Sequence, residues 1–242
     1  MLGLDTATMA CSVALLQDDL LLGEYTLNTR KTHSERLMPL IDSLLRECAV
    51  EREQLGAVAA AAGPGSFTGI RIGLATARGL AQGLGIPAAG VSTLEAAAEA
   101  VMVPGALICP ILDARRSQVY AALYRREPAP ELDLETLIPP AAGALSSLVE
   151  KLKTYREPVV FTGEGLSSYG SYLEESLGSR AILAVPPSRF NRAGLVAWRG
   201  RMLLKANPGL SYRELLPIYL RRPEAERRAG EEKGGEVFGG NH

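Results

Sequence analysis

Apolar residues form short runs at the start of the chain and helical stripes further on. The runs at residues 2–5, 12–17 and 20–27 are separated by polar positions, which predicts an antiparallel meander of three strands. From Ser34 the apolar residues recur every three or four positions, which predicts an amphipathic helix. An apolar strand at 57–62, a turn at 63–69 and a second helix over about 70–83 complete a β-β-β-α-β-α unit.

The second half of the chain repeats this order. Apolar runs at 106–112, 119–124 and 132–138 precede a predicted helix at 145–152 and a further run at 159–162. Asp5 lies seven residues before Ser12, and Asp113 lies seven residues before Tyr120. The sequence AGPGSFTG from Ala62 is echoed by TGEGLSSYG from Thr162. We therefore predict an internal duplication.

A proline-glycine pair and the composition of the last residues predict two lobes and a tail. We place the lobe boundary at Pro104-Gly105, which gives an N-terminal lobe at 1–103 and a C-terminal lobe at 104–220. Within the second lobe, 191–206 has the pattern of an amphipathic helix and contains the sole tryptophan, Trp198, for which core packing is the expected role. Residues 221–242 are rich in Arg, Glu and Gly, and we expect a mobile tail.

Composition restricts the classes of function. A chain of 242 residues with 47% hydrophobic and 22% charged residues is typical of a folded protein. Its net charge of −1 supplies no large positive field, so nucleic-acid binding by the chain alone should be weak. Four arginine pairs could contact a nucleic-acid backbone, although solvated surface is the simpler interpretation: Arg115/Arg116, Arg125/Arg126, Arg221/Arg222 and Arg227/Arg228.

Cysteine usage and hydropathy point to a reducing compartment. The three cysteines form no C-x-x-C pair, so neither a disulfide framework nor a thiolate zinc site is predicted. No signal peptide is evident at the start. The least charged stretches are interrupted by glycine and proline, so none is expected to span a membrane. We expect a cytoplasmic protein.

Four segments resemble the TsaB (YeaZ) family in order and spacing. They are LGLDTATMACSVALL from Leu2, HSERLMPLI from His33, AAGPGSFTGIRIGLATARGLAQGLGIP from Ala61 and GVSTLEAAAEA from Gly90. The run GPGSFTGIRIG is the most specific of these. The resemblance is close over 1–101 and looser afterwards. It implies an α/β fold of the two-lobed actin-like (ASKHA, ribonuclease-H-like) type, a duplicated β-β-β-α-β-α unit with mixed sheets flanked by helices.

The resemblance also implies a non-catalytic subunit in the formation of threonylcarbamoyladenosine in tRNA. Such a subunit would bind TsaD directly, join TsaE in a ternary complex, reach tRNA through that complex and form a homodimer when alone. Proteins similar to TsaD hold a metal with two histidines four residues apart. The corresponding residues here are Thr93 and Ala97, and the only histidines are His33 and His242. We expect neither a metal nor a catalytic residue.

The turn at 63–69 has two interpretations. Its glycine amides and the following helix N-terminus could cradle a phosphate, or its glycines could adopt positive φ and let the helix approach closely. Asp5 and Asp113 could likewise coordinate a nucleotide-bound magnesium ion or cap a turn. Weak nucleotide-loop candidates are Asp5, Thr6, Gly63, Gly65 and Asp113. No cofactor is required, and weak ATP or ADP binding is possible.

The second helix has two faces of small residues, one with Gly73, Ala77 and Ala81 and the other with Ala75, Gly79 and Gly83. Each interior glycine costs about 1 kcal/mol relative to alanine, so close packing on more than one side must compensate. We predict that one side meets the sheet and the other meets a partner, unless both faces are buried within the lobe. The predicted partner interface comprises Leu37, Leu40, Ile41, Leu44, Leu45, Gly73, Ala77, Leu80 and Ala81.

Two other functions compete with that of an accessory subunit. The alternative is an ATP-dependent phosphotransferase or ATPase of the same fold, although no Walker lysine follows the glycine turn. A self-sufficient homodimer with a proteolytic or chaperone role ranks last, because Ser66 lacks a G-x-S-x-G elbow.

Overall fold

A computed structural model describes residues 1–29, 32–128 and 133–221. The chain divides into two compact units, one formed by Met1–Glu99 with Asn191–Ile218 and the other by Ala100–Phe190 with the residues from Tyr219 onward.

The first unit is built on a five-stranded sheet. The strands are β1 (Leu2–Asp5), β2 (Cys11–Gln17), β3 (Leu20–Leu27), β4 (Val58–Gly63) and β5 (Ala88–Ser92), in the order β3-β2-β1-β4-β5. The first three strands pair antiparallel, as predicted, and β4 and β5 add in parallel. Strands β1 and β4 are buried along their whole length, as expected for strands covered on both faces.

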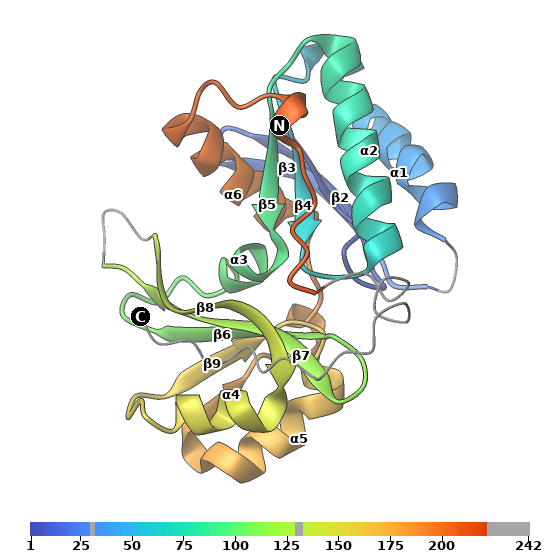
Figure 1. Ribbon diagram of the computed structural model, residues 1–242. Helices are drawn as coiled ribbons and strands as arrows, with labels where there is room; N and C mark the ends of the chain where they lie inside the picture. The colour runs from blue at the N-terminus through green and yellow to red at the C-terminus, as the bar shows by residue number, and fades with distance from the viewer. Residues whose placement is uncertain (30–31, 129–132, 222–242) are drawn as a thin grey trace. The chain divides into compact units, whose positions relative to one another are not determined.

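Helices cover both faces of this sheet (Figure 1). The helices α1 (His33–Glu47) and α2 (Phe67–Leu84) lie on one face, and α6 (Ala193–Ala206) lies on the other with α3 (Thr93–Ala98) beside it. The predicted stripe of α1 faces inward, and the core between the sheet and these helices is mainly Leu, Ile, Val and Ala. Burial of this apolar surface is the main stabilising contribution.

The second unit repeats the arrangement. Its sheet has the order β10-β9-β6-β7-β8, formed by β6 (Leu107–Asp113), β7 (Gln118–Arg126), β8 (Leu134–Ala144), β9 (Val159–Thr162) and β10 (Ala181–Leu183). The helices α4 (Leu145–Leu152) and α5 (Leu166–Leu177) pack against this sheet. Short 3-10 turns elsewhere in the chain span Arg52–Gln54, Gly178–Arg180, Pro186–Ser188 and Tyr212–Glu214.

The duplication is confirmed and extends one strand further than predicted. In both sheets a three-stranded antiparallel meander is followed by two parallel strands. The sequence analysis missed β5 and β10. Strand β10 has only three residues and none of them is fully buried, so its hydrophobic pattern is too short to distinguish from a loop.

The predicted division at 104–220 differs from the structure. The second unit begins near the predicted boundary, but Asn191–Ile218 returns to the first unit. The predicted tail, apart from Arg221, lies outside the described residues. The helix at 191–206 was predicted, but its packing partner could not be read from its own sequence.

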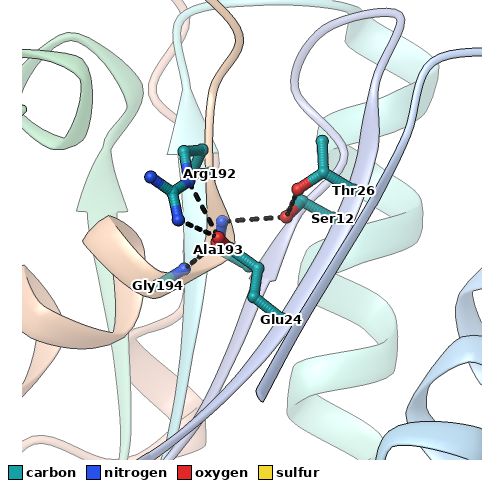
Figure 2. A network of polar contacts seen from close by, with 6 residues as sticks. All are labelled: Ser12, Glu24, Thr26, Arg192, Ala193 and Gly194. Carbon is teal, nitrogen blue, oxygen red and sulfur yellow. Dashed lines mark hydrogen bonds and ion pairs between the residues drawn. The ribbon is translucent and has the colours of Figure 1, made fainter. Parts of the chain in front are cut away.

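A polar network explains why α6 returns to the first sheet (Figure 2). The N-cap residue Arg192 makes no side-chain cap bond. The amide of Ala193 instead donates to Oγ of Ser12 at 3.0 Å, and the amide of Gly194 donates to Oε1 of Glu24 at 2.8 Å. The other carboxylate oxygen of Glu24 accepts two bonds from the guanidinium of Arg192. Strands β2 and β3 thus supply the acceptors that the first turn of a helix lacks.

Close approach of the backbones completes the contact between α6 and the sheet. An added Cβ on Gly3 would lie 2.3 Å from the carbonyl oxygen of Ala193, and one on Gly200 would lie 2.4 Å from Cβ of Ala59. Glycine at these two positions allows the helix to lie directly on β1 and β4. The return of the chain therefore depends on both polar caps and small residues.

Removing the Glu24 carboxylate should loosen α6. Glu24→Ala leaves the Gly194 amide and the Arg192 guanidinium without their acceptor, and we expect a loss of about 2 kcal/mol in the free energy of unfolding. Arg192→Ala is the matched control. Because the Arg192 side chain is 50% exposed, its pair should contribute less than about 1 kcal/mol. Urea denaturation of the two variants tests this difference, and equal losses would contradict the capping role.

The three cysteines should differ in reactivity. Cys11 and Cys109 are buried and Cys48 is half-buried. Burial raises the pKa of the Cys11 thiol to about 11, with the nearby Asp5 carboxylate adding to the effect, and burial also raises the pKa of Cys109. Because the thiolate is the nucleophile, the native chain at pH 8 should react rapidly with a disulfide reagent at Cys48 alone. All three thiols should react after unfolding, and rapid native modification of Cys11 would contradict the burial described.

Candidate functional site

The turn between β1 and β2 contains the first predicted nucleotide-loop residues, and both are buried. Asp5 and Thr6 are each 1% exposed. Oδ1 of Asp5 accepts a hydrogen bond from the amide of Ala7 at 2.9 Å, and the hydroxyl of Thr6 donates to the carbonyl of Gly69 at 2.7 Å. Asp5 therefore caps the turn, which is the simpler of its two interpretations.

The glycine turn at 63–69 packs against this β1–β2 turn. Gly63 and Gly65 have φ of 116° and 157°. An added Cβ on Gly65 would lie 2.2 Å from the carbonyl oxygen of Ala7, and one on Gly69 would lie 2.0 Å from that of Thr6. The amide of Ser66 also donates to Ala7 at 2.6 Å. Close approach of two backbones thus accounts for these glycines, and phosphate binding stays a prediction.

The second unit has a corresponding turn with a different exposure. Oδ1 of Asp113 accepts from the amide of Arg115 at 2.7 Å, the same i to i+2 pattern that Asp5 makes with Ala7. It also accepts from the Tyr169 hydroxyl at 3.1 Å. Gly165 donates its amide to Ile111 at 3.0 Å, as Ser66 does to Ala7. Asp113 is exposed, so this copy alone presents its carboxylate to solvent.

The turn between β6 and β7 is strained. Arg115, Arg116 and Ser117 have φ of 63°, 55° and 56°, a region that non-glycine residues occupy at a cost of about 1–3 kcal/mol each. Three such residues in succession are unusual for an ordinary hairpin, which normally has glycine or asparagine there. Strain of this kind is often found at functional positions. Apart from the arginine pair, no local pattern of residues indicates this strain.

The arginines of the predicted pairs differ in burial and in contacts. Arg126 was expected on the surface but is fully buried, where its Nε donates to the carbonyl of Val101 at 3.1 Å. Arg125 is partly exposed and pairs with Glu157. Arg221 donates to the carbonyl of Ala114 at 3.0 Å. Arg222, Arg227 and Arg228 lie outside the described residues.

The predicted partner interface lies mostly inside the first unit. Seven of its nine residues are buried there, so the apolar patch expected from them is not exposed: Leu37, Ile41, Leu44, Leu45, Gly73, Ala77 and Ala81. An added Cβ on Gly73 would lie 2.5 Å from Oγ1 of Thr6. Only Leu40 and Leu80 are partly exposed. Packing within the unit accounts for the seven, and contact with a partner stays a prediction.

The second small face of α2 is the one that solvent reaches. Ala75, Gly79 and Gly83 are exposed, and an added Cβ on either glycine would meet no atom within 4 Å. These three residues are the outer face of α2. The sequence identified both faces of the helix but could not tell which one the sheet would cover, because both consist of small residues.

A groove beside α1 was missed by the sequence analysis. It has a volume of about 660 Å³ and is lined by Leu27, Glu35, Arg36, Pro39 and Leu40. Its lining comes from the end of β3 and the first half of α1, consecutive elements that are close in the sequence, but no local motif shows how they pack. Of the predicted interface residues only Leu40 reaches it.

Thr93 and Ala97 lie on α3 and are 0% and 6% exposed. The residues described contain no cluster of three or more His, Cys, Asp or Glu side chains that could hold a metal ion. His33 lies at the start of α1 with its Nε2 2.9 Å from the carbonyl oxygen of Thr8, which is a structural contact. No helix in the described ranges is long and apolar enough to cross a membrane.

Two units with the same strand order and flanking helices define a protein of the actin-like (ASKHA) class. The fold is shared at the level of architecture with the ethanolamine utilization protein EutJ from Carboxydothermus hydrogenoformans, at a TM-score of 0.50 and 16% identity over 82% of this chain and 89% of that one. This class contains both enzymes and non-catalytic proteins, so the fold alone does not specify a function.

Comparisons with known proteins narrow the class. The family model of TsaD, tRNA N6-adenosine threonylcarbamoyltransferase, matches residues 21–184. The tRNA threonylcarbamoyladenosine biosynthesis protein TsaB of Bacillus subtilis is 36% identical over 93% of this chain and 95% of its own length. YeaZ from Pseudomonas aeruginosa has a TM-score of 0.74 and 28% identity over 90% of this chain and 98% of its own. The chain belongs to the TsaB (YeaZ) family.

The glycines of α2 offer a matched pair of substitutions. Gly69→Ala places a methyl group against the Thr6 carbonyl, and we expect a loss of about 1–3 kcal/mol in the free energy of unfolding. Gly79→Ala adds a methyl group in open space and removes a helix-weakening glycine, so a gain of about 0.5–1 kcal/mol is expected. Thermal and urea unfolding measure both. Similar effects from the two substitutions would contradict the close contact at Gly69.

Proposed function

We propose that the chain is a non-catalytic subunit of the machinery that forms threonylcarbamoyladenosine in tRNA. In this function it binds TsaD, supports it together with TsaE, and performs no bond chemistry itself. The surface that binds TsaD also pairs two copies of the chain when TsaD is absent. No cofactor is required.

One observation carries this function. The chain matches the model of the transferase family over most of its described length, yet it has Thr93 and Ala97 where the resemblance implies metal-binding histidines. A buried hydroxyl and a methyl group are not ligands for a transition metal. A protein with the transferase's architecture and without its metal ligands is suited to pair with the transferase rather than to replace it.

The nucleotide-loop candidates fit the same function. The Asp5 carboxylate is buried and accepts a hydrogen bond within its own turn. The main chain of Thr6 and Ala7 occupies the space that side chains at positions 69 and 65 would need. A kinase of this fold would need these groups accessible to a metal-bound phosphate. This packing weighs against the alternative of an ATP-dependent phosphotransferase or ATPase.

The outer face of α2 is the best-suited surface for TsaD. Exposed glycines weaken a helix by about 1 kcal/mol each. A partner's backbone packed closely against them would compensate for this cost, because glycine has no side chain that keeps the partner away. The partly exposed Leu80 and Leu40 lie on α2 and on the adjacent α1 and extend this surface with apolar area. The buried Gly73 and Ala77 are not needed for the contact.

Gly79→Leu tests the surface directly. Gly79 is exposed and an added Cβ there meets no atom within 4 Å, so folding of the isolated chain should be unaffected, whereas a helix packed on the outer face would be displaced. We expect the affinity for TsaD to fall at least tenfold, equivalent to about 1.4 kcal/mol, in isothermal titration or sedimentation of the purified pair.

Gly56→Leu is the matched control. Gly56 is also exposed with open space around it, but it lies in the loop before β4. TsaD should bind this variant as it binds the unmodified chain. If the chain does not associate with TsaD, the proposed function is wrong. If Gly79→Leu leaves the affinity unchanged, only the choice of surface is wrong.

A further inference from the structure

The strained β6–β7 turn displays positive charge at the tip of a hairpin. Arg115, Arg116 and Ser117 are exposed, and within the described residues the Arg115 guanidinium has no hydrogen-bond partner. Arg221 reaches the same turn through its bond to the Ala114 carbonyl. Three guanidinium groups therefore gather at one turn of a chain whose net charge is −1.

Three hydrogen bonds hold this turn in its strained form. The amide of Ala114 donates to Gln118 at 2.9 Å across the hairpin, and Asp113 accepts from the Arg115 amide. Tyr169 on α5 donates its hydroxyl to the same carboxylate. Partial burial raises the pKa of Tyr169, and its hydrogen bond to Asp113 adds to this effect, consistent with a hydroxyl that stays protonated and donating. Left-handed backbone at three arginine and serine residues persists because these contacts impose it.

We propose that the β6–β7 turn contacts the phosphate backbone of tRNA within the complex. Guanidinium groups match phosphate oxygens in charge and in hydrogen-bond geometry. A turn that is already fixed loses little conformational freedom when it binds. The inference rests on the proposed function, because it assumes that tRNA is brought to the complex in which this chain participates.

The exposure of the turn favours a nucleic-acid backbone over a free nucleotide. Residues 115–117 project into solvent at a hairpin tip, where a small ligand would bury little surface. A polymer held elsewhere in the complex needs only point contacts of this kind, and such contacts position the nucleic acid without reading its sequence. The net charge of −1 also fits a supporting contact rather than an independent binding site.

Salt dependence of tRNA binding tests the contact. The complex of the full chain with TsaD is titrated with a fluorescent tRNA transcript at 50–200 mM KCl. For Arg115→Glu we expect the affinity near 0.1 M salt to fall about five- to tenfold. The negative slope of log K against log salt should become shallower by about 1. The matched control is Arg156→Glu, which reverses an exposed arginine of the same unit away from the turn and should leave both values unchanged.

A second variant separates binding from folding. Asparagine tolerates the left-handed conformation better than arginine does, so Arg115→Asn removes the charge without disturbing the turn. Its melting temperature should stay unchanged or rise by up to about 3 °C, while its tRNA affinity should fall as for the charge reversal. A turn with only a structural role would change the melting temperature and not the salt slope.

The outcomes distinguish the possible failures. Normal association with TsaD together with an unchanged salt slope in both variants overturns this contact and leaves the proposed function intact. Loss of ATP binding by the variants with unaltered tRNA binding would assign the turn to a nucleotide instead and overturn the proposal. Absence of any association with TsaD overturns the proposed function and this inference together.

Discussion

The main chain of Thr6 and Ala7 lies against the first turn of α2 without space for a methyl group between them. This contact determines the position of α2 on the sheet, because Gly65 and Gly69 admit the β1–β2 turn and Gly73 admits the side chain of Thr6. The Ser66 amide in the glycine turn also donates to the carbonyl of Ala7, so it is already paired within the unit. A motif that resembles an anion cradle in sequence is used here to join two parts of one core.

The same helix then has one small face left over. Since the sheet covers Gly73, Ala77 and Ala81, the outer face with Ala75, Gly79 and Gly83 is retained at a cost in helix stability that the isolated unit does not compensate. A close-packed neighbour would provide that compensation. The chain belongs to the TsaB family, and in the function proposed above TsaD is this neighbour.

Much of the fold could be predicted from the sequence, because hydrophobic periodicity and turn residues are local signals. The meander, α1, α2, α6 and the duplication all follow from them. Packing relations could not be predicted in this way. The return of α6 to the first unit depends on Glu24, 168 residues before Arg192, and on Ser12, 181 residues before Ala193. Burial of Arg126 depends on an acceptor at Val101.

The candidate site was predicted less completely than the fold. Periodicity gave two faces of α2 but not the one that the sheet would cover. It also could not show that most of the leucine stripe of α1 is buried within the unit, and contact of that stripe with a partner stays a prediction. The Asx turns at Asp5 and Asp113 agree with the simpler interpretation of both residues. The turn that contains the left-handed backbone at 115–117 is held partly by long-range contacts from Tyr169 and Arg221, which no local pattern of residues encodes.

The most direct test is a reconstituted modification assay with purified components. Threonylcarbamoyladenosine formed on a tRNA transcript is measured by mass spectrometry with this chain alone, with TsaD and TsaE alone, and with all three, each supplied with ATP and the threonylcarbamoyl donor. We predict substantial modification only when the chain and TsaD are both present. Modification by the chain without TsaD, or equal modification with and without the chain, would contradict a supporting, non-catalytic role.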